Sequence, residues 1–429
     1  MAEETTTKLV LAVGTNFDND LIERLRGLHV AELYGATSAT PFGGGRPKMV
    51  LPHLSAERVQ EHIRNARDAG FRFSYLFNAA CYGNHEFIAR HQHTLLDYAA
   101  ELVDWGVTGF TVASPFLIDL LSRRFPDVAI KASVFCQIDS ISRLQYYLAA
   151  GVTEVAFPFD ANRNFEFLKA ARAATDARFT LVGNELCLFK CMYTPFHGCA
   201  VAHDSQGFDR GGSPLAHNYW VLRCTGDRYR HPEEFLKARW LRPEDLDTYE
   251  EMGVNVVKLA TRDKSTGWIV RCATAYHERH YDGNLLDILN SIEGYVEYQR
   301  QHDPRFSRKI ALARRVPGPL FKAMAAVASR LPGFRGRNTF ASFGRMPGDL
   351  AHLLLEYYEQ TPQVEIDNRV LDGFLDRFRE IDCLDTDCDT CGHCRHFADQ
   401  SVRFDDSAVQ RQLERIEQIL ARVRVDGER

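Results

Sequence analysis

The sequence has no long hydrophobic run and little excess charge of either sign. No apolar segment approaches the roughly 18 residues that a membrane-spanning helix needs, so we expect no membrane span. The formal net charge is −5 at pH 7, from 52 Lys and Arg against 57 Asp and Glu. This balance predicts no strong overall attraction to nucleic acid or to an anionic membrane. The first residues lack the basic and apolar regions of a secretory signal, and we expect a cytoplasmic location.

Internal repeats and low-complexity tracts are also absent. Hydrophobic residues make up 45% of the 429 positions and charged residues 25%, which is typical of a globular protein. This composition excludes a wholly disordered, collagenous or coiled-coil chain. The length suits one α/β barrel of about 250 residues with a smaller extension.

Short, almost continuously apolar segments recur along the first two thirds of the chain, as expected for strands buried on both faces. Amphipathic segments that end in glycine, such as 54–70 and 142–151, lie between them and indicate helices. Alternation of this kind predicts a (β/α)8 TIM-like barrel, with a doubly wound sheet as the alternative. The eight predicted strands are 8–14, 29–36, 71–79, 107–115, 129–136, 152–159, 179–187 and 254–260.

The connection between the seventh and eighth strands is much longer than the others. Residues 188–253 are rich in Cys, His, Gly and Pro, and loops longer than about 15 residues are usually functional. We therefore predict a barrel over residues 1–283 with a Cys-rich insertion at 188–253. A mainly helical C-terminal extension would follow over 284–429, with helices predicted at 284–301, 364–382 and 409–423.

The extension contains a basic segment, 304–348, that has no Asp or Glu. It predicts either a surface that faces phosphate or another anionic partner, or a solvated arm that packs on the acidic remainder. Its ten cationic residues are Arg305, Arg308, Lys309, Arg314, Arg315, Lys322, Arg330, Arg335, Arg337 and Arg345.

Eleven cysteines stand out in a chain expected in a reducing compartment, where clustered thiols more often bind metal or take part in chemistry. Four of them, Cys187, Cys191, Cys199 and Cys224, lie in or beside the insertion. Thiolates favour zinc or iron–sulfur clusters. Three interpretations remain open: an iron–sulfur cluster on these four residues; zinc on Cys187, Cys191, His197 and His203; or small buried side chains without a ligand.

The second group, Cys383, Cys388, Cys391 and Cys394, has a more specific spacing. Three cysteines in a C-x₂-C-x₂-C run with a fourth just upstream resemble a ferredoxin-type pattern. Four thiolates on one short segment would repel one another without a cation. We expect a metal here, either a second iron–sulfur cluster or zinc, which could serve only to hold the tail in place.

Polar residues that follow predicted strands should gather at the catalytic end of a barrel. Lys258, Arg262 and Arg163 could hold a carboxylate or phosphate there, and Glu185 could move protons. Cys81 and Cys136 follow the third and fifth strands and should face the same end, whereas Cys272 is predicted to lie in the core. The glycine-rich loop before Arg46 matches no nucleotide-binding pattern.

These features together resemble a known family. The NELC-x₃-C segment, Cys224 and the two stretches 240–263 and 268–289 are similar to collagenase-like peptidases of family U32. The resemblance covers roughly residues 8–290. It implies a TIM-like barrel with a 4Fe–4S cluster on four cysteines, used for oxygen-independent hydroxylation with prephenate implicated as the oxygen donor. Targets in the family are a ubiquinone precursor, transfer-RNA uridine and ribosomal-RNA cytidine, and some members act as heteromeric pairs.

The resemblance assigns cluster ligands by position. Cys187 and Cys191 lie where the family has its first two ligands, although three residues separate them where relatives commonly have about six. Cys224 corresponds to a later ligand, and Cys199 is our choice for the remaining one. Lys258, Arg262 and Arg163 would then orient an anionic donor.

Three functions remain as hypotheses. The first is an iron–sulfur-dependent enzyme that hydroxylates or otherwise modifies a small molecule, a peptide or, less favoured by the net charge, RNA. The second is a peptidase; the sequence has no Ser–His–Asp or HExxH pattern, but a Cys–His pair such as Cys81 and His85 would suit one. The third is a non-catalytic redox or assembly partner, and a partner protein or homologous subunit is compatible with each.

Overall fold

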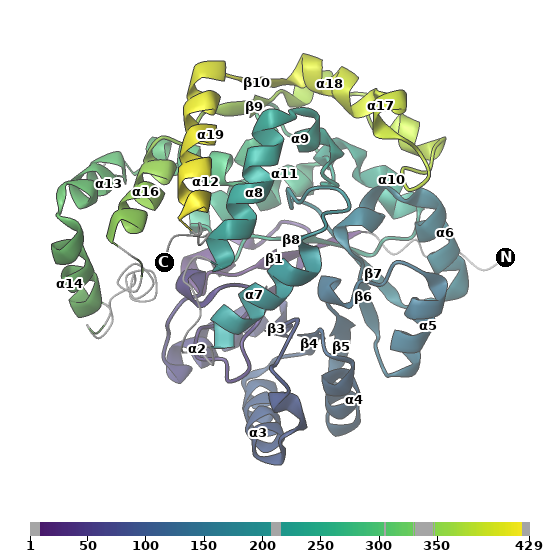
Figure 1. The fold of residues 1–429 in the computed structure, drawn as a ribbon. Helices are drawn as coiled ribbons and strands as arrows, with labels where there is room; N and C mark the ends of the chain where they lie inside the picture. Colours follow the sequence, from purple (N-terminus) through teal and green to yellow (C-terminus); the bar gives the residue numbers. More distant parts are fainter. Residues whose placement is uncertain are drawn as a thin grey trace.

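Eight parallel strands close into a barrel in the order of the sequence, which confirms the predicted (β/α)8 fold (Figure 1). The computed structural model describes residues 9–206, 216–303, 306–328, 330, 346 and 348–422. The strands are β1 (Val10–Gly14), β2 (Val30–Gly35), β3 (Arg72–Phe77), β4 (Gly109–Val112), β5 (Ala129–Ala132), β6 (Glu154–Ala156), β7 (Arg178–Val182) and β8 (Val256–Leu259). Closure comes from β1, which pairs with both β2 and β8.

Helices surround the barrel and bury apolar faces against it, as amphipathic segments between buried strands should. Local signals mark their ends. The hydroxyl of Ser140 caps α5 by accepting the amide of Arg143, and α3 ends at Gly106, whose φ of 112° favours glycine. The surrounding helices are α1 (Asn19–Leu25), α2 (Ala56–Asp68), α3 (Ala89–Trp105), α4 (Pro115–Arg124), α5 (Ile141–Ala149), α6 (Phe165–Ala174) and α11 (Thr266–Glu278).

The barrel interior contains a buried charge cluster as well as apolar side chains. Lys131 is ion-paired with Glu32 and lies 3.2 Å from Glu154. The hydroxyl of Thr180 donates to Glu154 at 2.8 Å. Burial alone would raise the pKa of Glu154, but Lys131 and the hydrogen bonds lower it overall. Such a cluster is tolerated because each charge has an opposite partner.

The long connection after β7 is a helical insertion rather than an irregular loop. It contains α7 (Thr194–Gln206), α8 (Ala216–Arg230), α9 (Glu233–Lys237) and α10 (Leu246–Glu251). In Figure 1, α7 and α8 cross in front of the barrel strands. The sequence pattern of α7 does not reveal a helix, because its polar and apolar residues are not sorted onto separate faces.

The C-terminal extension packs on this insertion. Helix α18 (His393–Ser401) contacts α9, and α19 (Asp406–Ala421) contacts α8 and α16 (Gly348–Glu359). The predicted helix at 409–423 is confirmed as α19. The predicted helix at 284–301 is present in part, as a 3₁₀ turn over Leu285–Asp287 followed by α12 (Ile292–His302).

The helix predicted at 364–382 is wrong. The segment forms β9 (Val364–Ile366), which pairs antiparallel with β10 (Val402–Phe404), and two 3₁₀ turns over Asn368–Val370 and Asp376–Arg379. Hydrogen bonds from Asn284 to β9 override the local pattern: its side-chain amide donates to Val364 O, and its oxygen accepts the Ile366 amide.

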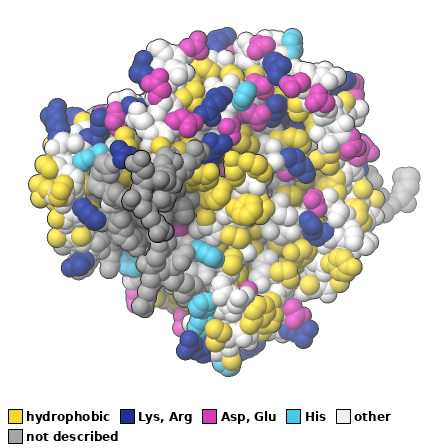
Figure 2. Space-filling model, in the orientation of Figure 1, with side chains coloured by type: hydrophobic (Ala, Val, Ile, Leu, Met, Phe, Trp, Pro, Cys, Tyr) yellow, Lys and Arg dark blue, Asp and Glu magenta, His cyan; other side chains and the backbone are white. Residues whose placement is uncertain are grey.

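The basic segment is described only in part. Its two helices are α13 (Phe306–Arg315) and α14 (Gly318–Ala328), whereas Arg305, Arg335, Arg337 and Arg345 lie outside the described residues. Arg314 forms ion pairs with Glu356 and Glu359 of α16, which supports packing on the acidic remainder for this part. Apolar side chains are exposed on both helices, and Figure 2 shows them at the left edge. They are Leu312, Leu320, Met324 and Val327.

Candidate active site at the barrel mouth

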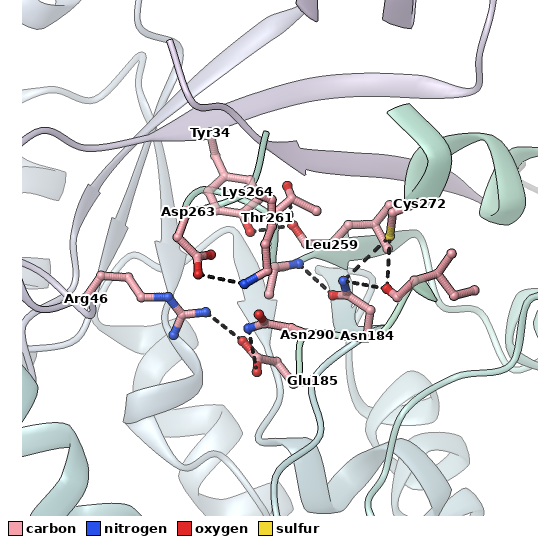
Figure 3. A network of polar contacts seen from close by, with 12 residues as sticks. Tyr34, Arg46, Asn184, Glu185, Leu259, Thr261, Asp263, Lys264, Cys272 and Asn290 are labelled. Atoms are coloured by element: carbon pink, nitrogen blue, oxygen red, sulfur yellow. Dashed lines mark hydrogen bonds and ion pairs between the residues drawn. The ribbon is translucent and has the colours of Figure 1, made fainter. Parts of the chain in front are cut away.

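The loops after β7 and β8 are fastened together at the C-terminal end of the barrel by Asn184. Its side-chain oxygen accepts the amide of Ala260 at 2.7 Å, and its nitrogen donates to Ile288 O at 3.2 Å. Its backbone carbonyl accepts the amide of Asn290 at 2.7 Å. One buried residue therefore joins the two strand ends to the start of the C-terminal extension (Figure 3).

Glu185, the predicted proton carrier, follows β7 at this end of the barrel. One carboxylate oxygen is 2.8 Å from the guanidinium of Arg46, and the other accepts from the side-chain amide of Asn290 at 3.1 Å (Figure 3). Burial by itself would lower the pKa of Arg46, but Glu185 and Asp263 raise it overall. The charged pair positions Glu185 as a carboxylate that can accept a proton or a hydrogen bond from a substrate.

Lys258 and Arg262 lie beside Tyr34 on the same side of the mouth. The ammonium of Lys258 is 4.0 Å from the ring centroid of Tyr34, and the guanidinium of Arg262 is 5.9 Å from it. Burial, reinforced by the charge of Arg262, lowers the pKa of Lys258 to about 7. Within the described part of the chain, Lys258 has no ion pair. It can therefore gain and lose a proton near neutral pH.

The charge balance of the mouth favours an anion. Burial lowers the pKa of Arg262 to about 10, with a further contribution from Arg46. Burial would raise the pKa of Asp263, but Lys264 and Arg46 hold it at about 2. Lys264 is occupied by Asp263 at 2.7 Å. Arg46, Arg262 and Lys258 together exceed the charge of Glu185 and Asp263, so a carboxylate or phosphate is the complementary ligand.

Arg163 has a different role from the anion binding that the sequence predicts. Its guanidinium is buried and donates to the carbonyls of Leu236, at 2.6 Å, and Trp240, at 3.1 Å. It also lies against the rings of Trp240, Phe374 and Phe378. Burial and the neighbouring Arg239 lower its pKa to about 10. These contacts join the insertion to the C-terminal extension.

Three of the four cysteines predicted for the first cluster come together near Glu185. Burial raises the pKa of the Cys187 thiol, and the nearby charges of Glu185, Cys224 and Cys191 raise it further. Burial and Cys224 likewise raise the pKa of Cys191. The thiol of Cys224 donates to Val221 O at 3.2 Å. The loop after β7 and helix α8 thus supply a three-thiol group beside the ion pair.

Cys199 is placed with Cys81 instead. Burial and the charge of Cys81 raise the pKa of Cys199. His203, one turn further along α7, lies with its Nε2 3.2 Å from the sulfur of Cys81. Burial lowers the pKa of His197 to about 4. The structure therefore separates Cys199 and His203 from the three-thiol group to which two of the sequence interpretations assigned them.

The four C-terminal cysteines line one small cavity of about 30 Å³. The cavity also contains Phe189, Lys237 and Arg239, which belong to the insertion. Burial raises the pKa of Cys394 to about 11, while Arg163 and Arg239 act in the opposite direction and Cys383 and Cys388 raise it again. The four residues are Cys383, Cys388, Cys391 and Cys394.

The donor chemistry of both thiol groups fits a soft metal. Thiolates select zinc or iron–sulfur clusters, and in each group neighbouring thiols raise one another's pKa, a repulsion that a bound cation would relieve. In the part of the chain that the structure describes, no three His, Cys, Asp or Glu side chains are already arranged as the ligands of one ion. The residues thus fit a metal by type and proximity, without a preformed coordination shell.

Two further cysteines lie outside the groups described above. Cys272 is buried and its thiol donates to Ile288 O, as a core residue should. Cys136 is also buried, with its thiol directed at the carbonyls of Val112 and Ala113 at the C-terminal end of β4. Sequence reasoning missed Arg46 and Asn290 as partners of Glu185. The only local signal was the glycine-rich loop before Arg46, which allows the backbone to approach closely: a Cβ at Gly45 would lie 2.7 Å from the Phe135 ring.

Among the described residues, no helix is both long and apolar enough to cross a membrane.

Comparison with known proteins gives matches centred on the barrel. Residues 46–166 match the model of Peptidase family U32. An uncharacterized protease of Methanocaldococcus jannaschii is 25% identical over 249 residues, which are 58% of this chain and 72% of that protein.

Two solved structures show weaker likeness. A U32 peptidase structure is 18% identical, with a TM-score of 0.44, over 61% of this chain and 96% of that one. A putative lyase/mutase from Burkholderia cenocepacia is 14% identical, with a TM-score of 0.29, over 53% of this chain and 86% of that one. The sequence matches show that part of the barrel is similar to peptidase family U32.

Proposed function

We propose that the protein is an iron–sulfur-dependent enzyme that modifies an anionic substrate at the barrel mouth without molecular oxygen. The observation that carries the proposal is the proximity of three thiols, Cys187, Cys191 and Cys224, to the Arg46–Glu185 pair. This places donors for a soft metal beside groups that bind anions and move protons. The family resemblance supports hydroxylation as the reaction and a prephenate-like dicarboxylate as the oxygen donor.

The protein side chains have separable tasks in this proposal. Arg46 and Arg262 attract and orient the carboxylates of the donor. Lys258, with its pKa of about 7, accepts or returns a proton, and Glu185 holds a hydrogen-bonding substrate group in place while Arg46 and Asn290 fix its carboxylate. The cluster, when bound, would supply one-electron chemistry next to this group.

We propose a second metal, iron–sulfur or zinc, at Cys383, Cys388, Cys391 and Cys394. Its support is the shared cavity and the cations around it. This site is adjacent to the first through Phe189, which lies between Cys187 and Cys191 in sequence and also lines the second cavity. The second metal would hold the tail against the insertion.

The test is anaerobic purification followed by iron, labile sulfide and zinc analysis and a visible spectrum. Wild type is compared with Cys187→Ser, Cys391→Ser and the matched control Cys272→Ser, whose thiol lies in the core. We expect Cys187→Ser to lose the iron and sulfide of the mouth but retain metal at the tail, and Cys391→Ser to do the reverse. Cys272→Ser should lose neither.

A contrary result has a clear meaning. Wild-type protein without iron or sulfide, or with an iron content that Cys187→Ser leaves unchanged, would overturn the iron–sulfur enzyme and favour a peptidase or a structural protein. If the iron is present, product analysis with candidate dicarboxylate donors tests the hydroxylase step. Equal substrate conversion by Lys258→Met and wild type would remove Lys258 from the mechanism.

A further inference from the structure

A cysteine and a histidine lie in contact at the β3 side of the barrel mouth, apart from the three-thiol group. Cys81 follows β3, and its sulfur is 3.2 Å from Nε2 of His203 on α7. The backbone N–H of Gly83 also donates toward this sulfur, at 3.4 Å. Both side chains are partly exposed, so a ligand in the mouth can reach them.

The pair is held by contacts that fix α7 on the neighbouring loops. Ser205 accepts the amide of Gly44 at 2.9 Å and donates to the Gly44 carbonyl at 3.1 Å. The side-chain amide of Gln206 donates to the backbone carbonyl of Cys81. The amide of Lys48 donates to Asp204 at 2.9 Å. Residues on both sides of His203 therefore set its position relative to Cys81.

This pairing differs from the one that the sequence suggested. His85, the candidate nearest in sequence, stacks on His91 with ring centroids 4.7 Å apart and a ring-nitrogen separation of 2.9 Å. His203 comes from the insertion and reaches Cys81 only because α7 folds across the mouth. A thiol within hydrogen-bond reach of an imidazole, with a backbone amide at the sulfur, is the arrangement of an activated nucleophile.

We propose that Cys81 and His203 form a nucleophile–base pair that transfers acyl groups from amides or esters. The Cys81 sulfur attacks the carbonyl carbon while its proton moves to Nε2 of His203. The carbon–nitrogen or carbon–oxygen bond then breaks, and His203 returns the proton to the leaving amine or alcohol. Water adds to the resulting thioester with His203 as base, releasing a carboxylic acid and restoring the thiol.

This inference does not depend on the iron–sulfur proposal, since the sequence of steps needs only water and the acyl substrate. The relatives supply circumstantial support, because the family and the archaeal relative are named as peptidase and protease. The cationic residues Arg46 and Arg262 lie at the same end of the barrel, so acyl substrates that carry a carboxylate are the favoured class.

The test uses the full chain, purified anaerobically and treated with p-nitrophenyl acetate and with iodoacetamide. Peptide mapping by mass spectrometry then reports acetylation and alkylation at each cysteine. We expect one acetyl group per chain on Cys81 and a p-nitrophenol burst that Cys81→Ser abolishes. His203→Asn and His203→Gln should slow the burst about 100-fold, while Cys272→Ser, the control in the core, leaves it unchanged.

Several outcomes would overturn the proposal. One is labelling of Cys199 as fast as Cys81; another is labelling of Cys81 at an unaltered rate in both His203 variants. Metal analysis on the same samples separates the two proposals: Cys81→Ser should retain all iron and sulfide. Loss of metal in Cys81→Ser would make Cys81 a ligand instead of a nucleophile. Retained circular dichroism in both His203 variants shows that a slower burst is not unfolding.

Discussion

The two thiol groups of this protein lie in different electrostatic surroundings. At the mouth, the carboxylate of Glu185 adds to the burial that raises the pKa of Cys187, and Arg46 acts in the opposite direction to a smaller extent. At the tail, Arg163 and Arg239 favour the charged form of Cys394, although burial and neighbouring thiols prevail. A metal at the mouth, as proposed, would therefore have to outweigh this carboxylate, whereas protein cations would assist the metal proposed at the tail. The difference suggests a reactive centre at the mouth and a structural one at the tail.

The largest expected effect follows from removing metal from the two thiol groups, which tests whether they differ. The tail cavity is formed by a segment near the surface, and Cys388 is exposed, so a chelator should reach it first. We expect EDTA to make the chain sensitive to trypsin at Arg379 and Arg395, which flank the tail cysteines, before the iron content of the mouth falls. Cleavage sites are found by mass spectrometry, and simultaneous loss of both metals would show that the two centres do not differ in this way.

Arg163→Ala should destabilise the junction between the two regions. The substitution leaves the carbonyls of Leu236 and Trp240 without their donor and empties the space among three aromatic rings. Loss of such buried bonds and packing costs about 3 kcal/mol in the free energy of unfolding. Urea unfolding measures this cost. A loss below about 1 kcal/mol, which is typical of surface substitutions, would contradict the assigned role.

Substitution of Glu185 and of Glu233 compares two ion pairs whose arginines differ in exposure. The two glutamates are covered alike, with side chains 12% and 11% exposed, but their partners differ: Arg46 is 29% exposed and Arg395 is 51% exposed. Glu185→Gln should cost about 1–3 kcal/mol of unfolding free energy, since Arg46 keeps a largely covered charge without its partner. Glu233→Gln should cost less than about 1 kcal/mol. Equal costs in thermal or urea unfolding would contradict the difference in burial.

A further prediction concerns pH, whose effect has opposite signs at two lysines. Lys258 has a pKa of about 7 in the folded protein, below its ordinary value of 10.5. Between these values the unfolded chain binds more protons, so the free energy of unfolding should rise with pH. Lys258→Met should remove this rise. Lys237, whose pKa is raised mainly by Glu234 against the effect of burial, stabilises the fold below pH 10.5 and loses that contribution above it.

Unfolding of the two Met variants between pH 6 and pH 10 provides the check, with wild type as reference. An unchanged slope in Lys258→Met would mean that this lysine stays charged in the folded protein. The Lys237→Met curve should run parallel to wild type over most of the range. It therefore serves as the control for removing a positive charge.

The barrel could be predicted because the strands are nearly continuous in apolar residues and several intervening helices, such as α2, α3 and α5, are followed by a glycine. The insertion could not, because α7 lacks a sorted apolar face and is held by the loop 43–45 and by Gln206 bonded to Cys81. The sequence predicted that Arg163 binds an anion at the barrel mouth because it follows β6. Arg163 lies at the end of the 3₁₀ turn Phe159–Arg163 and is buried against Trp240 and Phe374, which are distant in sequence.

For the cysteines, too, spacing in the sequence predicted some neighbours, and contacts between distant segments determine the others. Spacing grouped Cys187 with Cys191, and in the structure Cys224 lies close enough to act on the pKa of Cys187. Spacing also grouped Cys199 with them, but the helical geometry of α7 carries Cys199 toward Cys81. The partner of Cys81 could not be found from the sequence, because His203 is distant along the chain and two nearer histidines occupy each other.

The bonds made by Asn184 and Asn290 also bear on how this chain could be divided. The sequence pattern of the barrel ends near Gly283, yet the backbone of Asn290 is bound to Asn184 and its side chain to Glu185. A barrel cut at Gly283 would leave the key carboxylate with one partner fewer and the buried Asn184 without the acceptor at Ile288. The candidate site is therefore formed by the barrel and the extension together. Replacing either part with that of a relative would require the bonds of Asn184 and Asn290 to form again.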